Sequence, residues 1–319
     1  SGWNECLVTY IMAAASPTHG IPKEVYEQGW ARSGNMVNSR NYYNYEIKLA
    51  PNWGGPLFFI HYSHLGINPH GLKDQYADYW QEHVNTALIH YQYAIENPEG
   101  HENYSANNWG LTASDDPFGY TAHAPVLNDN GTISPTAALA SMPYTPEESM
   151  QALSYFYRER GNELFGKFGT YDAFNDEENW ISNSYLGIDQ GPIVVMIENH
   201  RSGLLWKNVM KDEDVQTGLD KLGFQYEIPT FSKQLLRTEK LEIYPNPSSG
   251  TVTVVLPTGL AGKTNLEIRA TNGQLVDKYR FNSVKEKITY DLNNLKNGIY
   301  MVRLSSEERQ FRTKLVINK

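Results

Sequence analysis

The hydrophobic pattern changes character once along the chain, near residue 225. Before that point, apolar residues recur at helical spacing in separate segments, which are joined by long loops rich in Gly, Pro and Asn. The pattern predicts helices over residues 3–15, 73–97, 145–166, 191–201 and 214–222. Thr145, Pro146 and Glu148 form a start signal, with Thr145 as the cap of a capping box. This part of the chain is therefore predicted to be mainly helical.

After residue 240 the pattern becomes short alternating runs of β-branched residues. These runs predict strands within residues 241–245, 250–257, 264–281, 287–292, 298–304 and 310–317. Asn272-Gly273 favours a tight hairpin turn, because both residues accept positive φ angles. Strands of this number and length form a small β-sandwich. We expect a helical domain at 1–224, a linker at 225–239 and an all-β domain at 240–319.

Two loops of the helical region are too long to be simple connections. They span residues 99–135 and 167–190 and contain Trp, Asp and Gly. Loops of this length in a compact domain usually carry function or lack order. Their composition favours a functional role.

Charge and aromatic content differ between the two regions. Of the 319 residues, 1–238 carry 14 basic and 28 acidic side chains and all seven Trp, while 239–319 carry 13 basic and 8 acidic side chains. The acidic part would repel nucleic acid. It suits neutral ligands that stack on rings, above all sugars, although large aromatic core residues explain the same composition. The single cysteine, Cys6, excludes an intrachain disulfide framework, and no apolar run approaches the length of a membrane helix.

The C-terminal motifs resemble a known export signal. Tyr244-Pro245-Asn246-Pro247 is followed by Gly250, then by residues 295–300 (LKNGIY) and a basic final strand. This order is similar to the C-terminal sorting domain of type IX secretion cargo. The resemblance implies export from a Bacteroidetes-type bacterium, with the secretion machinery as partner and a secreted or cell-surface location. A β-sandwich carbohydrate-binding module is the alternative.

The helical region resembles a family of glucan-acting enzymes. The similar stretches are residues 3–22, 61–66, 109–125, 130–150, 171–175 and 185–206. They resemble the glucoamylase-like domain of endo-β-1,2-glucanases (glycoside hydrolase family 144), which also occurs in cyclic β-1,2-glucan synthases. The resemblance implies an (α/α)₆ toroid that hydrolyses a neutral glucan with inversion, most plainly a β-1,2-glucan. The pattern yields only seven or eight of the twelve helices of a toroid, so we expect the C-terminal part of a longer enzyme with an incomplete cleft.

Two carboxylates are the catalytic candidates. Inversion needs a protonated carboxyl beside the leaving oxygen and a carboxylate that activates water on the opposite face. Glu5 follows Trp3-Asn4 at the start of an apolar helix, where burial raises a carboxyl pKa, and the resemblance places an essential Glu at this motif. We expect Glu5 to be the general acid, with a helix-terminal charge as the alternative. Asp189 lies at a loop-to-helix junction and either faces the cleft, where it would bind a sugar hydroxyl or act as base, or caps the helix.

The remaining candidates are predicted to bind substrate. Adjacent residues rarely point the same way, so at most one of Asp115 and Asp116 is expected to face sugar, the other forming a turn. The further candidates are rings that suit the C–H face of a glucose unit, each weighed against a core role, and donors that suit its hydroxyls. The rings are Trp53, Trp109, Tyr120 and Trp180, and the donors are His61, His64 and Arg201.

Other chemistries find little support. His61, His64, His70 and His83 do not stand at a metal-binding spacing, so no metal and no cofactor is expected. No Gly-x-Ser-x-Gly elbow occurs, which disfavours an α/β-hydrolase. A glycan-binding protein without catalysis, glucosyl transfer to another sugar, and action on α-1,4-glucan stay open as alternatives. We expect a monomer.

Overall fold

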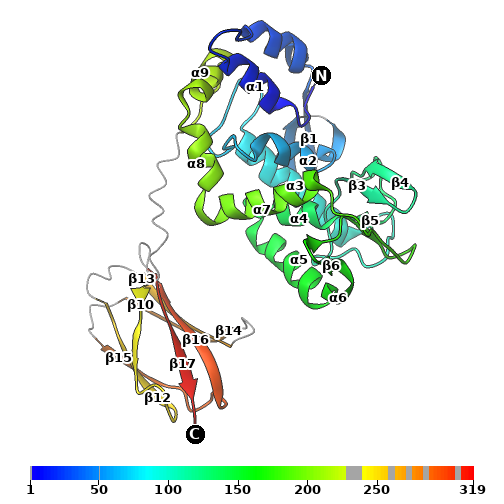
Figure 1. The fold of residues 1–319 in the computed structure, drawn as a ribbon. Helices are drawn as coiled ribbons and strands as arrows, with labels where there is room; N and C mark the ends of the chain where they lie inside the picture. The colour runs from blue at the N-terminus through cyan, green and yellow to red at the C-terminus, as the bar shows by residue number, and fades with distance from the viewer. Residues whose placement is uncertain are drawn as a thin grey trace. The chain divides into compact units, whose positions relative to one another are not determined.

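The computed structural model divides the chain into two units, each compact in itself. It describes residues 2–49, 51–227, 239–257, 263–270, 275–282, 287–305 and 310–319. The first unit covers residues 1–231 and the second covers residues 232–319. The first is helical with short hairpins and the second is all β (Figure 1). Within the described ranges, no helix is both long and apolar enough to cross a membrane.

Helices form most of the regular structure of the first unit. The α-helices are α1 (Leu7–Ala15), α2 (Phe58–His61), α3 (Tyr79–Glu96), α4 (Pro135–Ala140), α5 (Pro146–Arg158), α6 (Gly161–Leu164), α7 (Gly187–Ser202), α8 (Leu204–Met210) and α9 (Glu213–Leu222). A π-helix spans Val25–Trp30. The predicted helices 191–201 and 214–222 correspond to α7 and α9, whereas α2, α4 and α8 were not predicted.

Two predicted helices begin later than expected. The helix predicted over residues 3–15 starts at Leu7, so Glu5 lies in the turn before it. The helix predicted over 73–97 starts at Tyr79, because the Asp78 side chain accepts a hydrogen bond from the amide of Gln81 and caps the helix there. The first correction matters for the site, since it places Glu5 outside the helix.

The helix predicted over residues 145–166 is divided in two. Helix α5 ends at Arg158 and α6 follows it. The capping box is wrong: the Thr145 hydroxyl donates to the carbonyl of Ser141 at 3.3 Å instead of capping α5. Pro146 does occupy the first turn, as predicted.

The long loops contain short antiparallel strands that the hydrophobic pattern did not predict. Residues 99–135 contribute three of these strands and residues 165–181 contribute four. The strands of the first unit are β1 (Val37–Tyr42), β2 (Tyr45–Leu49), β3 (Ala113–Asp116), β4 (Gly119–Ala122), β5 (Thr132–Ile133), β6 (Phe165–Gly166), β7 (Gly169–Thr170), β8 (Phe174–Asn175) and β9 (Trp180–Ile181). Strand β8 lies between β5 and β9, which joins the two loops in one small sheet.

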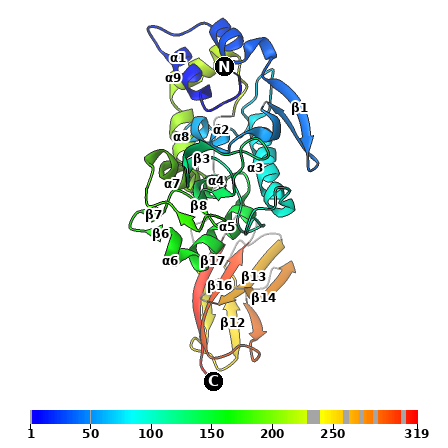
Figure 2. The same cartoon turned by 90° about the vertical axis from the view of Figure 1, so that its right-hand side faces the viewer.

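Helices distant in sequence pack side by side in the first unit. Helix α1 packs against α9, and α4 packs against both α5 and α7 (Figures 1 and 2). The core between them contains large apolar side chains such as Leu7, Trp30, Phe156 and Leu219. This packing fixes the start of α7 beside α4, which places Asp189 in the interior of the unit.

The second unit has two sheets with a common apolar core, and all but one of their strand pairs are antiparallel. The strands are β10 (Glu239–Lys240), β11 (Glu242–Tyr244), β12 (Thr251–Val255), β13 (Lys263–Ala270), β14 (Leu275–Asn282), β15 (Lys287–Asp291), β16 (Gly298–Ser305) and β17 (Gln310–Ile317). One sheet has the order β10-β17-β16-β13-β14, in which β10 runs parallel to β17, and the other has the order β11-β12-β15. Buried Val254, Leu266, Val302 and Leu315 lie in the core.

The predicted β-domain agrees with this unit in its strands. Each predicted run overlaps an observed strand, and the run 264–281 overlaps the pair β13 and β14. The short strand β10 was not predicted. The expected turn at Thr271–Gln274 lies outside the described residues, as do residues 228–238 of the expected linker. Strand β11 ends at Tyr244, at an edge of its sheet and directly before Pro245.

Candidate active site

Three aspartates from separate segments form an acidic cluster. Asp115 lies on β3, Asp172 follows β7, and Asp189 lies in the first turn of α7. The amide of Asp115 donates to Oδ2 of Asp172 at 2.8 Å. The hydroxyls of Ser182 and Ser184 both donate to Oδ2 of Asp115. Hairpin β3–β4, the 167–190 loop and α7 thus position this cluster jointly.

Asp172 and Asp189 are buried carboxyls that share an environment. Each side chain is 1% exposed. Tyr62 donates to Oδ1 of Asp189 at 3.0 Å. Among the described residues, no other group donates to Oδ1 of Asp172 or Oδ2 of Asp189, and the Asp172 and Asp189 carboxyls are hydrogen-bond partners of each other. Burial, together with the negative charge of Asp189, raises the pKa of Asp172 to about 7. Burial also raises the pKa of Asp189, and the pair can hold one proton at neutral pH.

Tyr120 provides an open aromatic face beside the cluster. It lies opposite Asp115 in the β3–β4 hairpin and is 55% exposed. Partial burial and the nearby charges of Asp189, Asp172 and Asp115 raise the pKa of its hydroxyl. An exposed ring next to buried carboxyls is an arrangement that can hold a sugar ring against acid–base groups.

Glu5 is connected to the cluster through two consecutive residues. The backbone carbonyl of Glu5 accepts a hydrogen bond from the hydroxyl of Ser63. Tyr62, which precedes Ser63 in the chain, donates its hydroxyl to Asp189. Asn4 stabilises the turn by accepting from the amide of Cys6 at 2.8 Å and from the indole of Trp30 at 3.3 Å. The Glu5 side chain is half-buried in this turn rather than enclosed in a helix.

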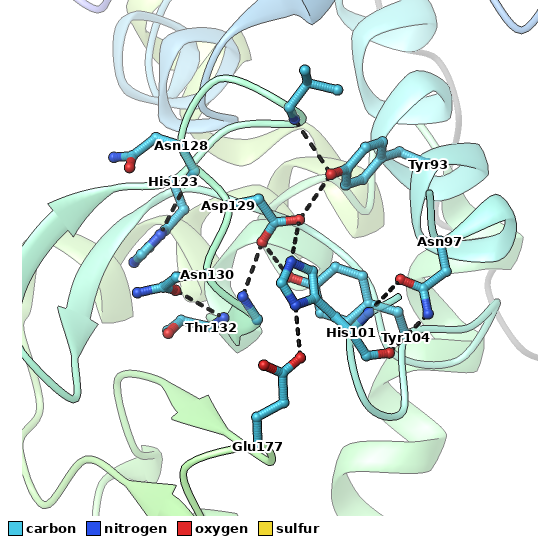
Figure 3. A network of polar contacts seen from close by, with 12 residues as sticks. Tyr93, Asn97, His101, Tyr104, His123, Asn128, Asp129, Asn130, Thr132 and Glu177 are labelled. Atoms are coloured by element: carbon cyan, nitrogen blue, oxygen red, sulfur yellow. Dashed lines mark hydrogen bonds and ion pairs between the residues drawn. The ribbon is translucent and has the colours of Figure 1, made fainter. Parts of the chain in front are cut away.

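A second polar network holds the two long loops together. The buried carboxylate of Asp129 accepts from the hydroxyls of Tyr93 and Tyr104 at 2.9 and 2.7 Å (Figure 3). His101 lies between Asp129 and Glu177, with Nδ1 at 2.7 Å from Glu177 Oε1 and Nε2 at 3.4 Å from Asp129 Oδ2. Since Glu177 belongs to the 167–190 loop and the others to α3 and the 99–135 loop, the network stabilises the loops that carry the acidic cluster.

Three predicted sugar-binding residues lie in the core. His61 and His64 are 2% and 0% exposed, and Trp109 is 0% exposed. His61 Nε2 lies 3.0 Å from the hydroxyl of Ser141, and His64 Nδ1 lies 3.0 Å from the carbonyl of Ile67. Burial lowers the pKa of His61 to about 3 and that of His64 to about 4. In this structure the three side chains are enclosed in the core and present no surface to a ligand.

The other predicted residues have separate surroundings. Trp53 is half-buried and stacks on Tyr42, with ring centroids 4.2 Å apart. Trp180 is half-buried on β9. Arg201 lies in the last turn of α7, about 18 Å along the helix from Asp189, and pairs with Glu198 at 3.0 Å. Arg201 is therefore not brought to the acidic cluster.

Asp116 turns away from Asp115, as expected of adjacent residues. Its carboxylate accepts from the amide of Phe118 at 2.7 Å, which closes the β3–β4 turn, and it lies 3.6 Å from His123 Nε2. Burial raises its pKa, but hydrogen bonds from Thr121 and Phe118 outweigh that effect and lower the pKa overall. Asp116 is thus a turn residue and Asp115 the member of the pair that joins the cluster.

Sequence reasoning missed Asp172 and Tyr62. Asp172 stands in Tyr171-Asp172-Ala173-Phe174, inside a loop that its length and composition already marked as functional. An aspartate between an aromatic and an apolar residue was the available signal. No pattern links Tyr62 to Asp189, 127 residues away. Among the described residues, no three His, Cys, Asp or Glu side chains gather in a way that could hold a metal ion.

Comparison with known families assigns both units. Residues 1–213 match the family model described as "Putative glucoamylase", and residues 242–318 match the secretion system C-terminal sorting domain. The chain belongs to this glucoamylase-like family. It also carries a C-terminal sorting domain of the kind that directs export by type IX secretion.

Several relatives are β-1,2-glucan-acting proteins. The chain is 58% identical to an endo-β-1,2-glucanase from Chitinophaga pinensis, solved with sophorotriose and glucose, with a TM-score of 0.69 over 70% of this chain and 55% of that one. It is 43% identical to a β-1,2-glucanase from Parabacteroides distasonis, with a TM-score of 0.67 over 70% of this chain and 34% of that one. An exo-β-1,2-glucooligosaccharide sophorohydrolase from Parabacteroides distasonis is 44% identical over 69% of this chain and 33% of its own length. The chain thus spans between a third and about half of these relatives.

Proposed function

We propose that the protein is an exported glycoside hydrolase that cleaves β-1,2-glucan as an endo-β-1,2-glucanase. The observation that carries the proposal is the buried carboxyl pair Asp172–Asp189, which lies beside the exposed ring of Tyr120. Relatives with 43–58% identity that are named as β-1,2-glucan hydrolases support the linkage. The packing of α1 against α9 and of α4 against α7 supports a toroid of paired helices as the fold.

We assign the two acidic functions of an inverting mechanism to Glu5 and the acidic cluster. Glu5 serves as general acid and protonates the leaving oxygen. On the other face, the Asp172–Asp189 pair binds a sugar hydroxyl or takes a proton from the attacking water, with Asp189 oriented by Tyr62. Tyr120 supports the sugar ring. Half-buried Trp53 and Trp180 stay candidates for more distant glucose units.

Release of reducing ends from linear β-1,2-glucan tests the function. We expect release from this glucan and none from α-1,4-glucan, with the product anomer inverted in proton NMR. Absence of release from linear β-1,2-glucan by the folded protein would contradict the proposal and favour a glycan-binding role.

An activated substrate tests the assignment of Glu5. In a dinitrophenyl β-glycoside of a β-1,2-gluco-oligosaccharide, the leaving group is dinitrophenolate. This anion departs without protonation, so its release does not need a general acid. We expect Glu5→Gln to lose more than 100-fold activity on β-1,2-glucan and to retain most activity on the activated substrate. Equal losses on both substrates would remove Glu5 from the role of acid.

The proposal places the mature protein outside the cell or on its surface as a monomer. The sorting domain supports export. The acidic cluster is made by residues of one chain, so no second subunit is needed to assemble it. Fractionation of producing cells tests the location, and sedimentation equilibrium tests the monomer.

A further inference from the structure

A surface pocket that the proposed active site does not use lies at the beginning of α3. It has a volume of about 470 Å³, which is enough for a mono- or disaccharide. The residues around it that matter for recognition are His70, Lys73, Asp78, Trp80, Tyr226 and Glu227. All six belong to the first unit.

The walls of the pocket are held by backbone hydrogen bonds. Lys73 and Gln225 exchange amide-to-carbonyl hydrogen bonds of 2.7 Å in both directions, which ties the segment before α3 to the segment after α9. Asp78 caps α3 and so fixes the position of Trp80 in its first turn. The opening is therefore formed by ordered backbone rather than by exposed side chains alone.

The lining combines an aromatic ring with paired charges. The half-buried indole of Trp80 packs edge-to-face against the His70 ring, with centroids 5.0 Å apart. Lys73 pairs with Asp78 at 2.8 Å, and His70 lies 3.9 Å from the carboxylate of Glu227. The charges of Lys73 and Asp78 neutralise each other, and such a pair next to a ring suits a neutral ligand with many hydroxyls better than an anion.

The pocket is remote from the acidic cluster. The Trp80 ring lies 6.4 Å from the ring of Trp206, whose amide donates to Asn199 Oδ1. Asn199 lies about 15 Å along α7 from Asp189. The pocket and the cluster thus lie near opposite ends of α7, and one glucose unit cannot contact both.

We propose that this pocket is a second carbohydrate-binding site, which holds a glucose unit of β-1,2-glucan on the face of Trp80. Hydroxyls of the sugar bind the rim formed by Lys73, Asp78 and Glu227. The identity of the sugar rests on the proposed function. A site of this kind keeps a polymeric substrate close to the enzyme through multivalent binding.

Calorimetric titration with a thio-linked β-1,2-glucotriose tests the proposal, because its sulfur bridges resist hydrolysis. We expect two binding events for the full chain. Trp80→Ala removes one event, Lys73→Ala weakens the same event at least threefold, and Asp189→Asn leaves it intact. Lys211→Ala, an exposed lysine outside the pocket, is the matched control and changes neither event.

Trp80 also packs on Tyr144 and Trp206, so Trp80→Phe and Glu227→Ala accompany the first variant and keep the test valid if Trp80→Ala does not fold. Trp80→Phe is expected to retain weakened binding. A single binding event that Asp189→Asn abolishes, or events unaffected by Lys73→Ala and Glu227→Ala, would overturn the proposal. Hydrolysis by the wild-type chain is scored separately, so loss of the second site and loss of the proposed function are distinguished.

Discussion

The acidic cluster shows how burial at single residues creates acid–base groups. Asp172 and Asp189 lie within one hydrogen-bonded environment, and each has a carboxyl oxygen without a donor among the described residues other than the paired carboxyl. An uncompensated buried charge is costly, so the pair retains a proton up to pH values at which an exposed aspartate has long lost it. Groups that titrate near neutral pH are those that acid–base catalysis uses.

Asp172→Asn tests this pair at the residue scale. We expect reducing-end release to fall about 100-fold or more, since loss of an acid–base group typically costs a factor of 10²–10⁴. Because asparagine cannot ionise, the folded variant is also expected to lose the titration near pH 7. Asp214→Asn, an exposed aspartate on α9, is the control. Activity within threefold of wild type would exclude Asp172 from the chemistry.

The sequence predicted part of the site for a clear reason. Asp189, Asp115 and Tyr120 stand in segments with turn or helix signals, so the sequence alone predicted the local structure around them. Tyr62 binds Asp189 and Asp115 binds Asp172 across 127 and 57 residues, and such contacts depend on tertiary packing. The buried histidines show the same limit, because a His in a conspicuous motif is not distinguished by sequence from a His in the core.

At the scale of elements, hydrophobic periodicity located α1, α3, α5, α7 and α9 but not all their ends. The start of α3 at Tyr79 depends on the capping hydrogen bond of Asp78. The hairpins β3–β4 and β6–β7 escaped prediction because their strands are two to four residues long and their alternation is too brief to detect. In the second unit the strands are five to eight residues long in most cases, and the pattern identified them.

Glu82 links α3 to strand β2 and offers a test of that contact. Its buried carboxylate accepts from the amides of Lys48 and Leu49, each at 2.9 Å, and burial raises its pKa to about 7. A raised pKa means that the stabilising contribution is present below pH 4.5 and is lost as the pH rises through 7. We expect Glu82→Gln to be about 1 kcal/mol less stable at pH 5 in urea denaturation, with a smaller difference at pH 8.

The matched control for this measurement is Glu46→Gln, an exposed residue on the same strand β2. We expect it to change the free energy of unfolding by less than about 0.5 kcal/mol at both pH values. A Glu82→Gln deficit that grows from pH 5 to pH 8 would contradict the burial of an uncompensated carboxylate.

Gly250 is a position in the second unit where the backbone conformation favours glycine. Its φ is +144°, and a Cβ at this position would lie 2.0 Å from Oδ1 of Asn293. We expect Gly250→Ala to destabilise the second unit by about 1–3 kcal/mol, measured from its own thermal transition. Gly100→Ala is the control for the backbone conformation alone. Gly100 also has a positive φ, but nothing lies within 4 Å of the new Cβ. A smaller loss at Gly250 than at Gly100 would contradict the steric account.

At the scale of the whole molecule, buried histidines set the response to acid. Burial lowers the pKa of His61 to about 3 and of His64 and His90 to about 4, and lowers that of His83 well below its ordinary value. The unfolded chain takes up protons at these residues as the pH falls through 6.5, while the folded chain does not. Stability is therefore lost from pH 6.5 towards pH 4, at about 1.4 kcal/mol per pH unit for each proton.

Asp172 and Glu82 act in the opposite direction, since their raised pKa values favour the folded state as the pH falls below 7. The histidines are more numerous, so we expect the free energy of unfolding to be highest between about pH 6 and pH 7. His83→Leu removes one histidine that takes up a proton only on unfolding, so the free energy of unfolding is expected to fall less steeply with acid, by one proton. The substitution breaks no hydrogen bond of the ring among the described residues. His19→Leu, at an exposed histidine, is the control, and an equal acid response in both variants would contradict this explanation.

The most direct test of the central claim is reducing-end release from linear β-1,2-glucan by the wild-type chain, with Asp189→Asn and Asp214→Asn measured beside it. We predict release by the wild type and by Asp214→Asn, and a loss of at least 100-fold in Asp189→Asn with the fold retained by circular dichroism. Release by Asp189→Asn at the wild-type rate, or no release by the folded wild-type chain, would contradict the assignment of glucan hydrolysis to the acidic cluster.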